Sequence, residues 1–314
     1  MKISIVVLNW NRKNDTIQCL ESIAKLQVPD FKTPIQIIVV DNASTDNSQK
    51  EIKRALKVLN EKADFECELI INKKNLGFAE GNNVGIKHAI NHDADYVLIL
   101  NNDTVIDSKM VFALLECAKK HPKSGVISPK IYFAKGYEFR KERYKLRDLG
   151  NVIWYAGGAF DWNNIYGLNR GVDEVDKSQY DDVKELEFAT GACMFVRATA
   201  LKEVGLFDPK YYMYLEDVDL SVRLKKAGWK ILYCPDAILW HKVAQSSQIG
   251  SELNDYFIIR NRLIFGMRYA KFRTRLALYR ESQRLFWKGR YWQKRAVIDY
   301  YLRRFGRGSW NDKN

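Results

Sequence analysis

Residues 35–46 read IQIIVVDNASTD, an almost unbroken aliphatic run followed at once by polar residues. Such a run predicts a strand over residues 35–40 that is buried on both faces and ends in a polar loop. The same pattern occurs at residues 3–8, 67–71 and 96–100. Helical periodicity fills the intervals, at residues 16–26, 48–59, 81–91 and 109–121. Strands that alternate with helices predict an α/β fold, a Rossmann-like, mostly parallel sheet flanked by helices.

Polar residues follow each of the four expected strands. They are Asn9-Trp10-Asn11, Asp41 to Asp46, Asn75 to Asn83, and Asn101-Asn102-Asp103. Such residues also end strands and cap helices in proteins that bind nothing. In a parallel sheet, however, the carboxyl ends of the strands share one edge, and ligands bind beyond that edge. Four polar clusters there favour a crevice of nucleotide size.

The second half of the chain is less regular. Residues 122–187 mix aromatic residues, glycines and charges, and we expect an irregular or hairpin-containing insertion there. Regular structure is expected again over residues 188–197. Two helices, at 198–204 and 217–227, and a strand at 229–233 should follow.

Three carboxylates, Glu216, Asp217 and Asp219, open the second of those helices. Acidic residues in a first helical turn also complement the helix dipole, which needs no chemistry. Carboxylates this close repel one another, and the repulsion raises the pKa of at least one of them. A raised pKa suits a general base near neutral pH. On this reasoning Asp217 or Asp219 could deprotonate a hydroxyl.

Four motifs together resemble the family 2 glycosyltransferases. They are VVDNASTD (residues 39–46), NLGFA (75–79), LILNND (98–103) and EDVDL (216–220). The resemblance is nearest to the bacterial rhamnosyltransferase-like group and covers roughly residues 1–270. It implies an inverting, metal-dependent enzyme with the GT-A nucleotide-sugar fold.

The resemblance also implies the nucleotide and metal sites. Asp41 would hydrogen-bond the base, and Asn9 would line the base and the ribose. Asn75, Gly77 and Asn83 would line the nucleotide loop. Asn101, Asn102 and Asp103 stand at the family's D-x-D position, where Asn101 replaces the first aspartate. Asp103 would bind Mn²⁺ or Mg²⁺, and His241 would complete the metal site.

The same resemblance places the catalytic base at Asp217, with Glu216 and Asp219 beside the substrate. Trp154 and Gly158 fit a sugar-binding platform, although a core tryptophan is an open alternative. The implied donor is a dTDP- or UDP-sugar, with dTDP-rhamnose favoured. The implied acceptor is a hydroxyl of a glycan or lipid-linked molecule in cell-surface polysaccharide synthesis.

Other functions remain open at this point. A UDP-hexose transferase would use galactose, glucose or N-acetylglucosamine. A nucleotidyltransferase normally carries a glycine-rich loop after its first strand, and residues 9–12 lack glycine. A non-catalytic nucleotide- or carbohydrate-binding module is disfavoured by the joint presence of Asp103, Asp217 and His241.

The positive charge is concentrated at the C-terminus. The chain of 314 residues has 51 Lys and Arg against 38 Asp and Glu, a net charge of +13. Residues 254–314 alone carry 16 and 4, a net charge of +12. The nearly neutral remainder argues against a generally basic nucleic-acid-binding protein, so no nucleic-acid partner is expected. We therefore expect a catalytic domain over residues 1–253 and a basic helical extension over 254–314.

The extension also carries 14 of the chain's 40 aromatic residues. Spacings of three and four between Phe265 and Tyr279 predict one amphipathic helix through that stretch. Its aromatic face would either pack on the catalytic domain or meet an anionic membrane surface. Five scattered cysteines, no signal peptide and no apolar run of 18 residues favour a cytoplasmic protein. With the basic extension, this predicts a peripheral protein at the inner face of the cell membrane.

Overall fold

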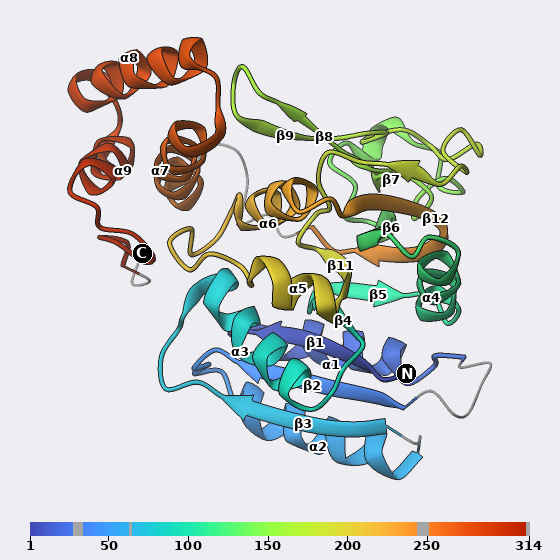
Figure 1. Cartoon of the computed structure of the whole chain (residues 1–314). Helices are drawn as coiled ribbons and strands as arrows, with labels where there is room; N and C mark the ends of the chain where they lie inside the picture. The colour runs from blue at the N-terminus through green and yellow to red at the C-terminus, as the bar shows by residue number, and fades with distance from the viewer. Residues whose placement is uncertain (28–33, 63–64, 244–250, 312–314) are drawn as a thin grey trace.

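The computed structural model describes residues 1–27, 34–62, 65–243 and 251–311 (Figure 1). Four parallel strands form one half of the main sheet, in the order β3-β2-β1-β4. They are β1 (Ile3–Asn9), β2 (Ile35–Asp41), β3 (Phe65–Ile71) and β4 (Tyr96–Asn101). All four strands expected from the aliphatic runs are therefore confirmed.

Helices cover both faces of this half. α3 (Gly77–Asn91) packs across β1 and β2 on one face, while α1 (Lys13–Ile23) and α2 (Ser48–Lys62) lie on the other (Figure 1). α4 (Met110–Lys120) packs on the second half of the sheet. α3 begins four residues earlier than the periodicity predicts, because the Asn75 Oδ1 atom accepts a hydrogen bond from the Gly77 N–H at its start.

The second half of the sheet contains a strand that the sequence analysis missed. β6 (Ser124–Phe133) is buried along its whole length, although it falls in the stretch expected to be irregular. Pro129 and Lys130 interrupt its apolar pattern. The Lys130 ammonium is buried in ion pairs with Asp176 and Asp181. Pro129 lies where β6 and its neighbour shift register, so its missing N–H breaks no regular ladder.

β12 (Lys230–His241) runs parallel to β6 and continues eight residues beyond the expected end at Tyr233. A bulge between Cys234 and Ile238 absorbs the irregular residues. β5 (Thr104–Ile106) pairs with β12 antiparallel. This longer strand carries His241 to the end of β4, at the edge where the polar loops gather.

The remaining elements before the extension belong to the second half of the sheet or lie beside it. β7 (Ile153–Tyr155) pairs with β6, and β11 (Cys193–Arg197) lies antiparallel between β4 and β6. β8 (Gly158–Asp161) and β9 (Tyr166–Asn169) form a separate hairpin, and β10 (Lys184–Glu185) pairs with β12. A 3₁₀ turn, η1, spans Lys141–Arg143. α5 (Ala198–Val204) and α6 (Glu216–Lys226) confirm the two helices expected there.

The extension forms three helices: α7 (Glu252–Tyr269), α8 (Phe272–Lys288) and α9 (Tyr291–Tyr301). The single helix expected through Phe265 and Tyr279 is wrong, because the backbone is extended at Ala270 and Lys271. α7 and its neighbours share a buried cluster with Tyr211 and with the apolar side of α6. The domain boundary expected after residue 253 falls inside α7, and residues 312–314 lie outside the described residues.

No helix of the described residues is long and apolar enough to cross a bilayer.

Candidate active site

A carboxylate and an imidazole meet where β4, β5 and β12 end. β4 ends at Asn101, and Asp103 lies in the turn before β5. The pairing of β5 with β12 sets His241 opposite Thr104. The Asp103 Oδ1 and His241 Nε2 atoms are therefore 3.0 Å apart. The Trp154 ring contacts the imidazole edge-on, with centroids 4.6 Å apart. The structure thus brings together both metal ligands expected from the sequence.

This pair fits two ligands of one divalent cation. Adjacent corners of an octahedron with bonds of ~2.1 Å lie roughly 3 Å apart, as these two atoms do. The Nδ1 atom of His241 is buried with no hydrogen-bond partner among the described residues, a cost of ~1–3 kcal/mol. Among those residues, no group of three or more His, Cys, Asp or Glu side chains is arranged to hold a metal ion. Further ligands would have to come from a bound molecule or water.

Asn9, Asp41 and Asn102 form one hydrogen-bonded group beside that pair. The Asn9 amide donates to Asp41 Oδ2 at 2.8 Å, and its own oxygen accepts from the Thr16 hydroxyl at 2.8 Å. Asn102 donates to the same hydroxyl at 2.9 Å. Asp41 is fully buried, and its other oxygen accepts from Ser44 and Gln49. Three of its roughly four acceptor positions are therefore used inside the protein.

The loop after β3 is organised by Asn42, which the sequence analysis did not select. The Asn42 amide donates to Asn75 Oδ1 at 2.8 Å and to the Gly77 carbonyl at 3.1 Å. Gly77 has φ +77°, and a Cβ there would lie 2.4 Å from the Tyr212 ring. The close approach that requires glycine is thus made by Tyr212, an aromatic residue just before α6.

Asn83 and Gly158 are engaged elsewhere. The Asn83 side chain donates to the carbonyl of Phe207 at 2.9 Å and accepts from its N–H at 3.1 Å. It ties α3 to the segment before α6. A Cβ on Gly158 would lie 2.4 Å from the Phe188 carbonyl oxygen. The space beside this glycine is filled by protein backbone, which speaks against the sugar contact expected from the sequence.

Asp217 lies in the first turn of α6 and is only partly exposed. Its Oδ2 atom accepts a 2.8 Å hydrogen bond from the Gly191 N–H, and Oδ1 accepts from the Val218 N–H. Burial raises the pKa of Asp217, while these backbone donors lower it. The result is a carboxylate that is fixed in direction and more basic than an exposed aspartate, as a general base requires.

Glu216 is more deeply buried than its neighbour. Its Oε2 atom has no hydrogen-bond partner among the described residues. Burial, and then the charge of Asp217, raises the pKa of Glu216 well above its usual value. Two adjacent buried carboxyls cannot both ionise cheaply. We assign the proton to Glu216, which leaves Asp217 as the anion.

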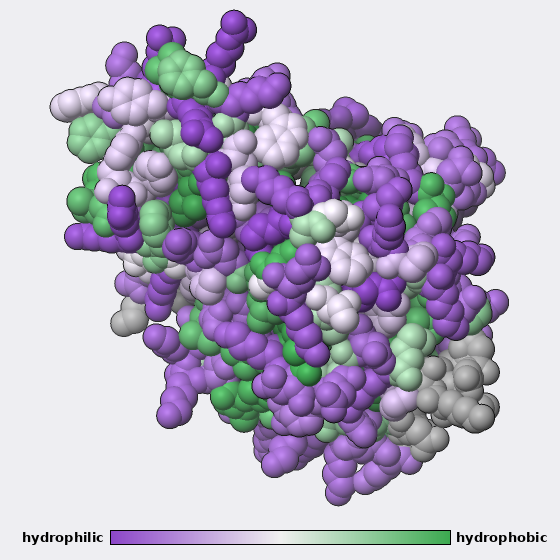
Figure 2. Space-filling view, viewed as in Figure 1, coloured by the Kyte–Doolittle hydropathy of each residue, from purple (hydrophilic) through white to green (hydrophobic). Residues whose placement is uncertain are grey.

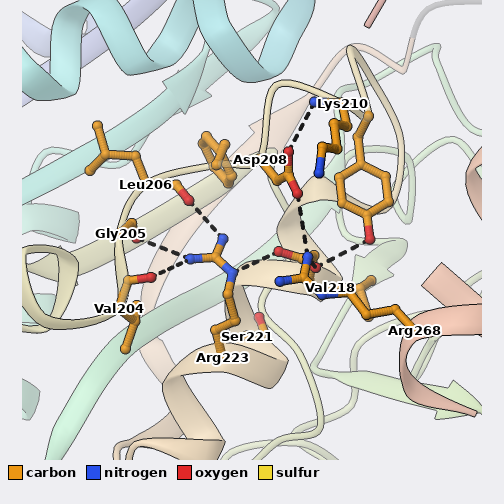
Figure 3. Close-up of polar contacts among 12 residues, drawn as sticks. Val204, Gly205, Leu206, Asp208, Lys210, Val218, Ser221, Arg223 and Arg268 are labelled. Carbon is orange, nitrogen blue, oxygen red and sulfur yellow. Dashed lines mark hydrogen bonds and ion pairs between the residues drawn. The ribbon is translucent and has the colours of Figure 1, made fainter. Parts of the chain in front are cut away.

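Asp219, the third carboxylate of the motif, has a structural role, and its two arginine partners, Arg223 and Arg268, are labelled in Figure 3. Asp219 is fully buried. Its oxygens accept hydrogen bonds from Arg223 at 2.7 Å, from Arg268 at 3.2 Å and from the hydroxyls of Tyr211 and Tyr269. No position is left for a substrate hydroxyl. The prediction that Asp219 contacts substrate is not supported, and its carboxylate instead joins α6 to the C-terminal end of α7.

β7 connects the two halves of the site. Trp154 contacts His241, while the next residue, Tyr155, lies close enough to Asp217 for the aspartate charge to add to the burial that raises the pKa of Tyr155. The backbone N–H of Asn101 donates to the carbonyl of Ala192 at 3.0 Å, which joins the D-x-D position to the loop that holds Asp217. The carboxylate–imidazole pair and the basic aspartate therefore share one edge of the sheet.

A cavity of about 450 Å³ opens beside Asn102 and Asp103. Three cationic residues line it: Arg12, Lys141 and Lys242. Sequence reasoning missed them as site residues. Two of them could have been selected by their position in the sequence. Arg12 directly follows the polar residues after β1, and Lys242 directly follows His241. Four carboxylates, those of Asp15, Asp103, Glu138 and Glu142, line the same cavity, and Asp15 pairs with both Arg12 and Lys242. The lining is therefore mixed in charge.

Comparison with known proteins places this site in a family. A family model described as "Glycosyltransferase like family 2" matches residues 2–266. The match ends inside α7, so it includes the first part of the basic extension. Among curated proteins, the N-acetylglucosaminyl-diphospho-decaprenol L-rhamnosyltransferase of Mycobacterium tuberculosis is 29% identical over 223 residues, which is 68% of each chain.

Solved structures share the fold at low sequence identity. TarS of Staphylococcus aureus in complex with UDP-GlcNAc has a TM-score of 0.58 at 17% identity, over 96% of this chain and 79% of its own. The mannosyltransferase PcManGT of Pyrobaculum calidifontis, in complex with GDP-Man and Mn²⁺, has a TM-score of 0.56 at 13% identity, over 96% and 74%. These likenesses confirm the GT-A fold expected from the sequence, here with a C-terminal helical extension.

Proposed function

The chain belongs to the family 2 glycosyltransferases, and from that premise we propose that it is an inverting, metal-dependent enzyme acting on a dTDP- or UDP-sugar. The observation that carries this proposal is the joint placement of the Asp103–His241 pair and Asp217 at one sheet edge, linked by β7. A single displacement needs leaving-group stabilisation on one side of the anomeric carbon and a base on the other.

Asp217 is the proposed base. The N–H groups of Gly191 and Val218 hold its carboxylate in one orientation, and burial raises its pKa. The neutral Glu216 beside it avoids a second negative charge. Asp217 takes the proton of an acceptor hydroxyl while that oxygen attacks the anomeric carbon, and the bond to the nucleoside diphosphate breaks. Because attack and departure occur on opposite faces, the configuration inverts.

Asp103 and His241 are the proposed metal ligands, with Mn²⁺ or Mg²⁺ in that place. When bound, such an ion neutralises charge that develops on the departing diphosphate. Arg12, Lys141 and Lys242 line the adjoining cavity together with four carboxylates. Asn9, Asp41 and Asn102 are the proposed base and ribose side of the donor site, because their hydrogen-bonded group lies next to Asp103.

We propose dTDP-rhamnose as the donor and a lipid-linked glycan in cell-surface polysaccharide synthesis as the acceptor. The support is the mycobacterial relative, whose name specifies L-rhamnosyl transfer to a diphospho-decaprenol acceptor. The alternative is a UDP-hexose donor, since the staphylococcal structural neighbour binds UDP-GlcNAc. A protein that binds such ligands without turning them over is a weaker alternative, because Asp217 is held as an oriented base.

Release of nucleoside diphosphate from a panel of nucleotide sugars tests this proposal. The panel contains dTDP-rhamnose, UDP-glucose, UDP-galactose and UDP-N-acetylglucosamine, each with Mn²⁺, Mg²⁺ or EDTA. We expect metal-dependent turnover with dTDP-rhamnose fastest. We also expect His241→Ala and Asp103→Asn to raise the Mn²⁺ concentration at half-maximal rate by at least tenfold. The exposed Asp93→Asn is the control. Equal rates in EDTA and Mn²⁺, or no turnover of any donor, would contradict the proposal.

We further propose that the chain meets an anionic membrane surface through α8. One side of this helix packs inward through Thr274, Leu278 and Ser282. The opposite side exposes a stripe of apolar residues, which we call the α8 stripe: Phe272, Leu276, Tyr279, Phe286 and Trp287. Phe272 and Trp287 are 79% and 72% exposed, unusually high for large apolar side chains. Figure 2 shows apolar rings among hydrophilic chains over this region, at the upper left.

Cationic side chains border the α8 stripe. Arg273, Arg275, Arg280, Arg284 and Lys288 are all exposed on the same helix. Aromatic residues on one face and cations beside them are the pattern of helices that lie in the headgroup region of a bilayer. Each cation near an anionic surface adds about 1 kcal/mol of attraction. In this proposal the protein lies at the inner face of the cell membrane and binds no nucleic acid.

Vesicle co-sedimentation tests the α8 stripe. With the full chain and vesicles of 30% anionic lipid, we expect Phe272→Ser with Trp287→Ser to weaken binding by about a hundredfold, since two large side chains no longer enter the bilayer. Leu146→Ser with Ile71→Ser, also exposed, should bind like the wild type. Binding that is unchanged by the stripe substitutions, or equal on neutral vesicles, would refute this partner. A gel shift at physiological salt checks for nucleic acid.

A further inference from the structure

The segment that leads into the catalytic helix has an unusual backbone. Tyr212, Tyr214 and Leu215 all have positive φ, at 66°, 67° and 69°. Left-handed conformations are disfavoured for residues with a Cβ and persist only where the surroundings hold them. Leu215 is the N-cap of α6, so this segment sets where the first turn of α6 begins. That turn contains Asp217.

Asn261 of α7 contacts the backbone of this segment through its side-chain amide. Its amide nitrogen lies within hydrogen-bond distance of three backbone carbonyl oxygens in the loop before α6. They belong to Tyr211 at 2.9 Å, Met213 at 2.6 Å and Tyr214 at 3.0 Å. Carbonyl oxygens only accept, so the NH₂ end of the amide must face them. Asn261 is fully buried, so bulk solvent does not reach these contacts. One side chain therefore fixes the backbone on both sides of Tyr212.

Arg260 completes the contact. It is fully buried, and its guanidinium donates to the carbonyls of Lys210 and Tyr211 at 3.2 and 2.9 Å. It also donates to Asn261 Oδ1 at 3.0 Å, which orients the Asn261 amide. The rings of Tyr256 and Phe257 lie beneath the guanidinium, 5.2 and 5.0 Å from it. Burying a charged arginine costs free energy unless its N–H groups are hydrogen-bonded. Here the two carbonyls and Asn261 accept those hydrogen bonds.

We infer that Arg260 and Asn261 are positioning residues for Asp217: they hold residues 210–215 in the left-handed path that presents the base at the site. The inference rests on the proposed function, because it takes Asp217 as the base. Arg268 of α7 also pairs with Asp219 in the first turn of α6, so α7 holds both the approach to the helix and the helix itself. Figure 3 labels Arg268 and the second arginine partner of Asp219, Arg223 of α6 itself. The first half of the basic extension thus belongs to the catalytic apparatus.

The pH dependence of turnover separates positioning from general stabilisation. Asp217 faces Gly191 and Val218 through hydrogen bonds, Glu216 within its own helix and Tyr155 from β7. If the segment relaxes, Asp217 becomes more hydrated, and its burial-raised pKa falls toward the ordinary value. A base with a lower pKa stays ionised to lower pH. The acidic limb of the kcat profile should therefore move to lower pH while kcat itself falls.

The test uses Asn261→Ala and the isosteric Asn261→Asp, which keeps the volume but cannot donate. Both should lower kcat for nucleoside diphosphate release by ten- to a hundredfold and shift the acidic limb down. The Kd for dTDP and the KM for the donor should stay within twofold. Arg262→Ala is the matched control, because Arg262 is buried on the same helix but binds Asn164 and Glu281. It should lower Tm without changing the kcat profile.

The outcomes distinguish the two proposals. If the wild type releases no nucleoside diphosphate from any donor, the proposed function fails and the inference, which takes Asp217 as the base, fails with it. If the wild type is active, the inference is overturned by kcat within twofold in Asn261→Asp. It is also overturned if Arg262→Ala reproduces the loss of kcat and the shifted limb at the same drop in Tm. If Asn261→Ala fails to fold, the isosteric variant decides.

Discussion

Glu216, Asp217 and Asp219 are three carboxylates within four residues, and their environments give them three different states. Asp219 is fully buried and paired with Arg223 and Arg268. Glu216 is buried with one oxygen unpaired, which favours its neutral form. Asp217 is partly exposed and held by two N–H groups. Only Asp217 combines a negative charge, a fixed direction and access to a substrate. A sequence motif alone could not separate them, because each state depends on residues distant in the chain.

Glu216→Gln should stabilise the protein at neutral pH. The pKa of Glu216 is raised in the folded state, so its ionisation opposes folding as pH rises above its unfolded value of about 4.3. Glutamine carries no such penalty. The gain in the free energy of unfolding should be near zero at pH 4 and grow with pH up to the folded pKa.

Denaturant unfolding at pH 4.5, 6 and 8 measures this gain, with the exposed Glu61→Gln as the control. A gain that is constant with pH, or a loss that grows with pH, would show that Glu216 is ionised and favourably paired in the folded protein.

At the scale of elements, the four strands of the first half of the sheet were predictable, while β6 and the full length of β12 were not. β1, β2 and β4 are nearly continuous aliphatic runs because both of their faces are covered. β3, at the edge of the sheet, alternates between partly buried and exposed positions. β6 is as buried as β1, β2 and β4, yet it contains Pro129 and Lys130, which are tolerated only through a register shift and two distant aspartates. β12 likewise crosses a bulge. These compensations lie in other parts of the chain and leave no local signal.

The packing of α7 against α8 makes an element-scale prediction at Gly266. A Cβ there would lie 2.2 Å from the Leu278 Cδ1 atom. Alanine would gain about 1 kcal/mol of helix propensity, but overpacking a buried contact costs about 1–3 kcal/mol. We expect the clash to win, so Gly266→Ala should lower the free energy of unfolding by roughly 1 kcal/mol.

A double-mutant cycle checks the cause. Leu278→Ala removes the clashing atom, so Gly266→Ala in that background should be neutral or stabilising. Additive losses in the Gly266→Ala, Leu278→Ala double variant would contradict the stated contact.

At the scale of the whole molecule, the charge of the extension proved less informative than its burial. The +12 of residues 254–314 predicts an appendage with its own partner. In the structure one side of the extension packs against α6 and the segment before it, and the other side exposes the α8 stripe. Of the two expected alternatives, packing occurs through α7 and the inner side of α8, while membrane contact of the α8 stripe stays a proposal. Composition could not assign them, because it does not show which face of each helix meets the body.

The candidate site was predictable where residues follow strands of the sheet. Asp103, His241, Asn9 and Asp41 converge as expected because strand ends share an edge. Asn83 and Gly158 were selected by motif alone and serve Phe207 and Phe188 instead. The sequence pattern of Arg260 and Asn261 gave no role, and a surface position was the default for Arg260, which is in fact fully buried. Their targets are backbone carbonyls about 50 residues earlier in the chain.

The central claim is that Asp217 is the base of a sugar transfer whose donor binds independently of it. The most direct measurement is donor turnover by Asp217→Asn, with the Kd for the nucleoside diphosphate measured on the same sample and the exposed Asp182→Asn as the control. The account predicts turnover lower by about 10²–10⁴-fold with the Kd within twofold of wild type. Turnover within threefold of wild type, with intact binding, would contradict it.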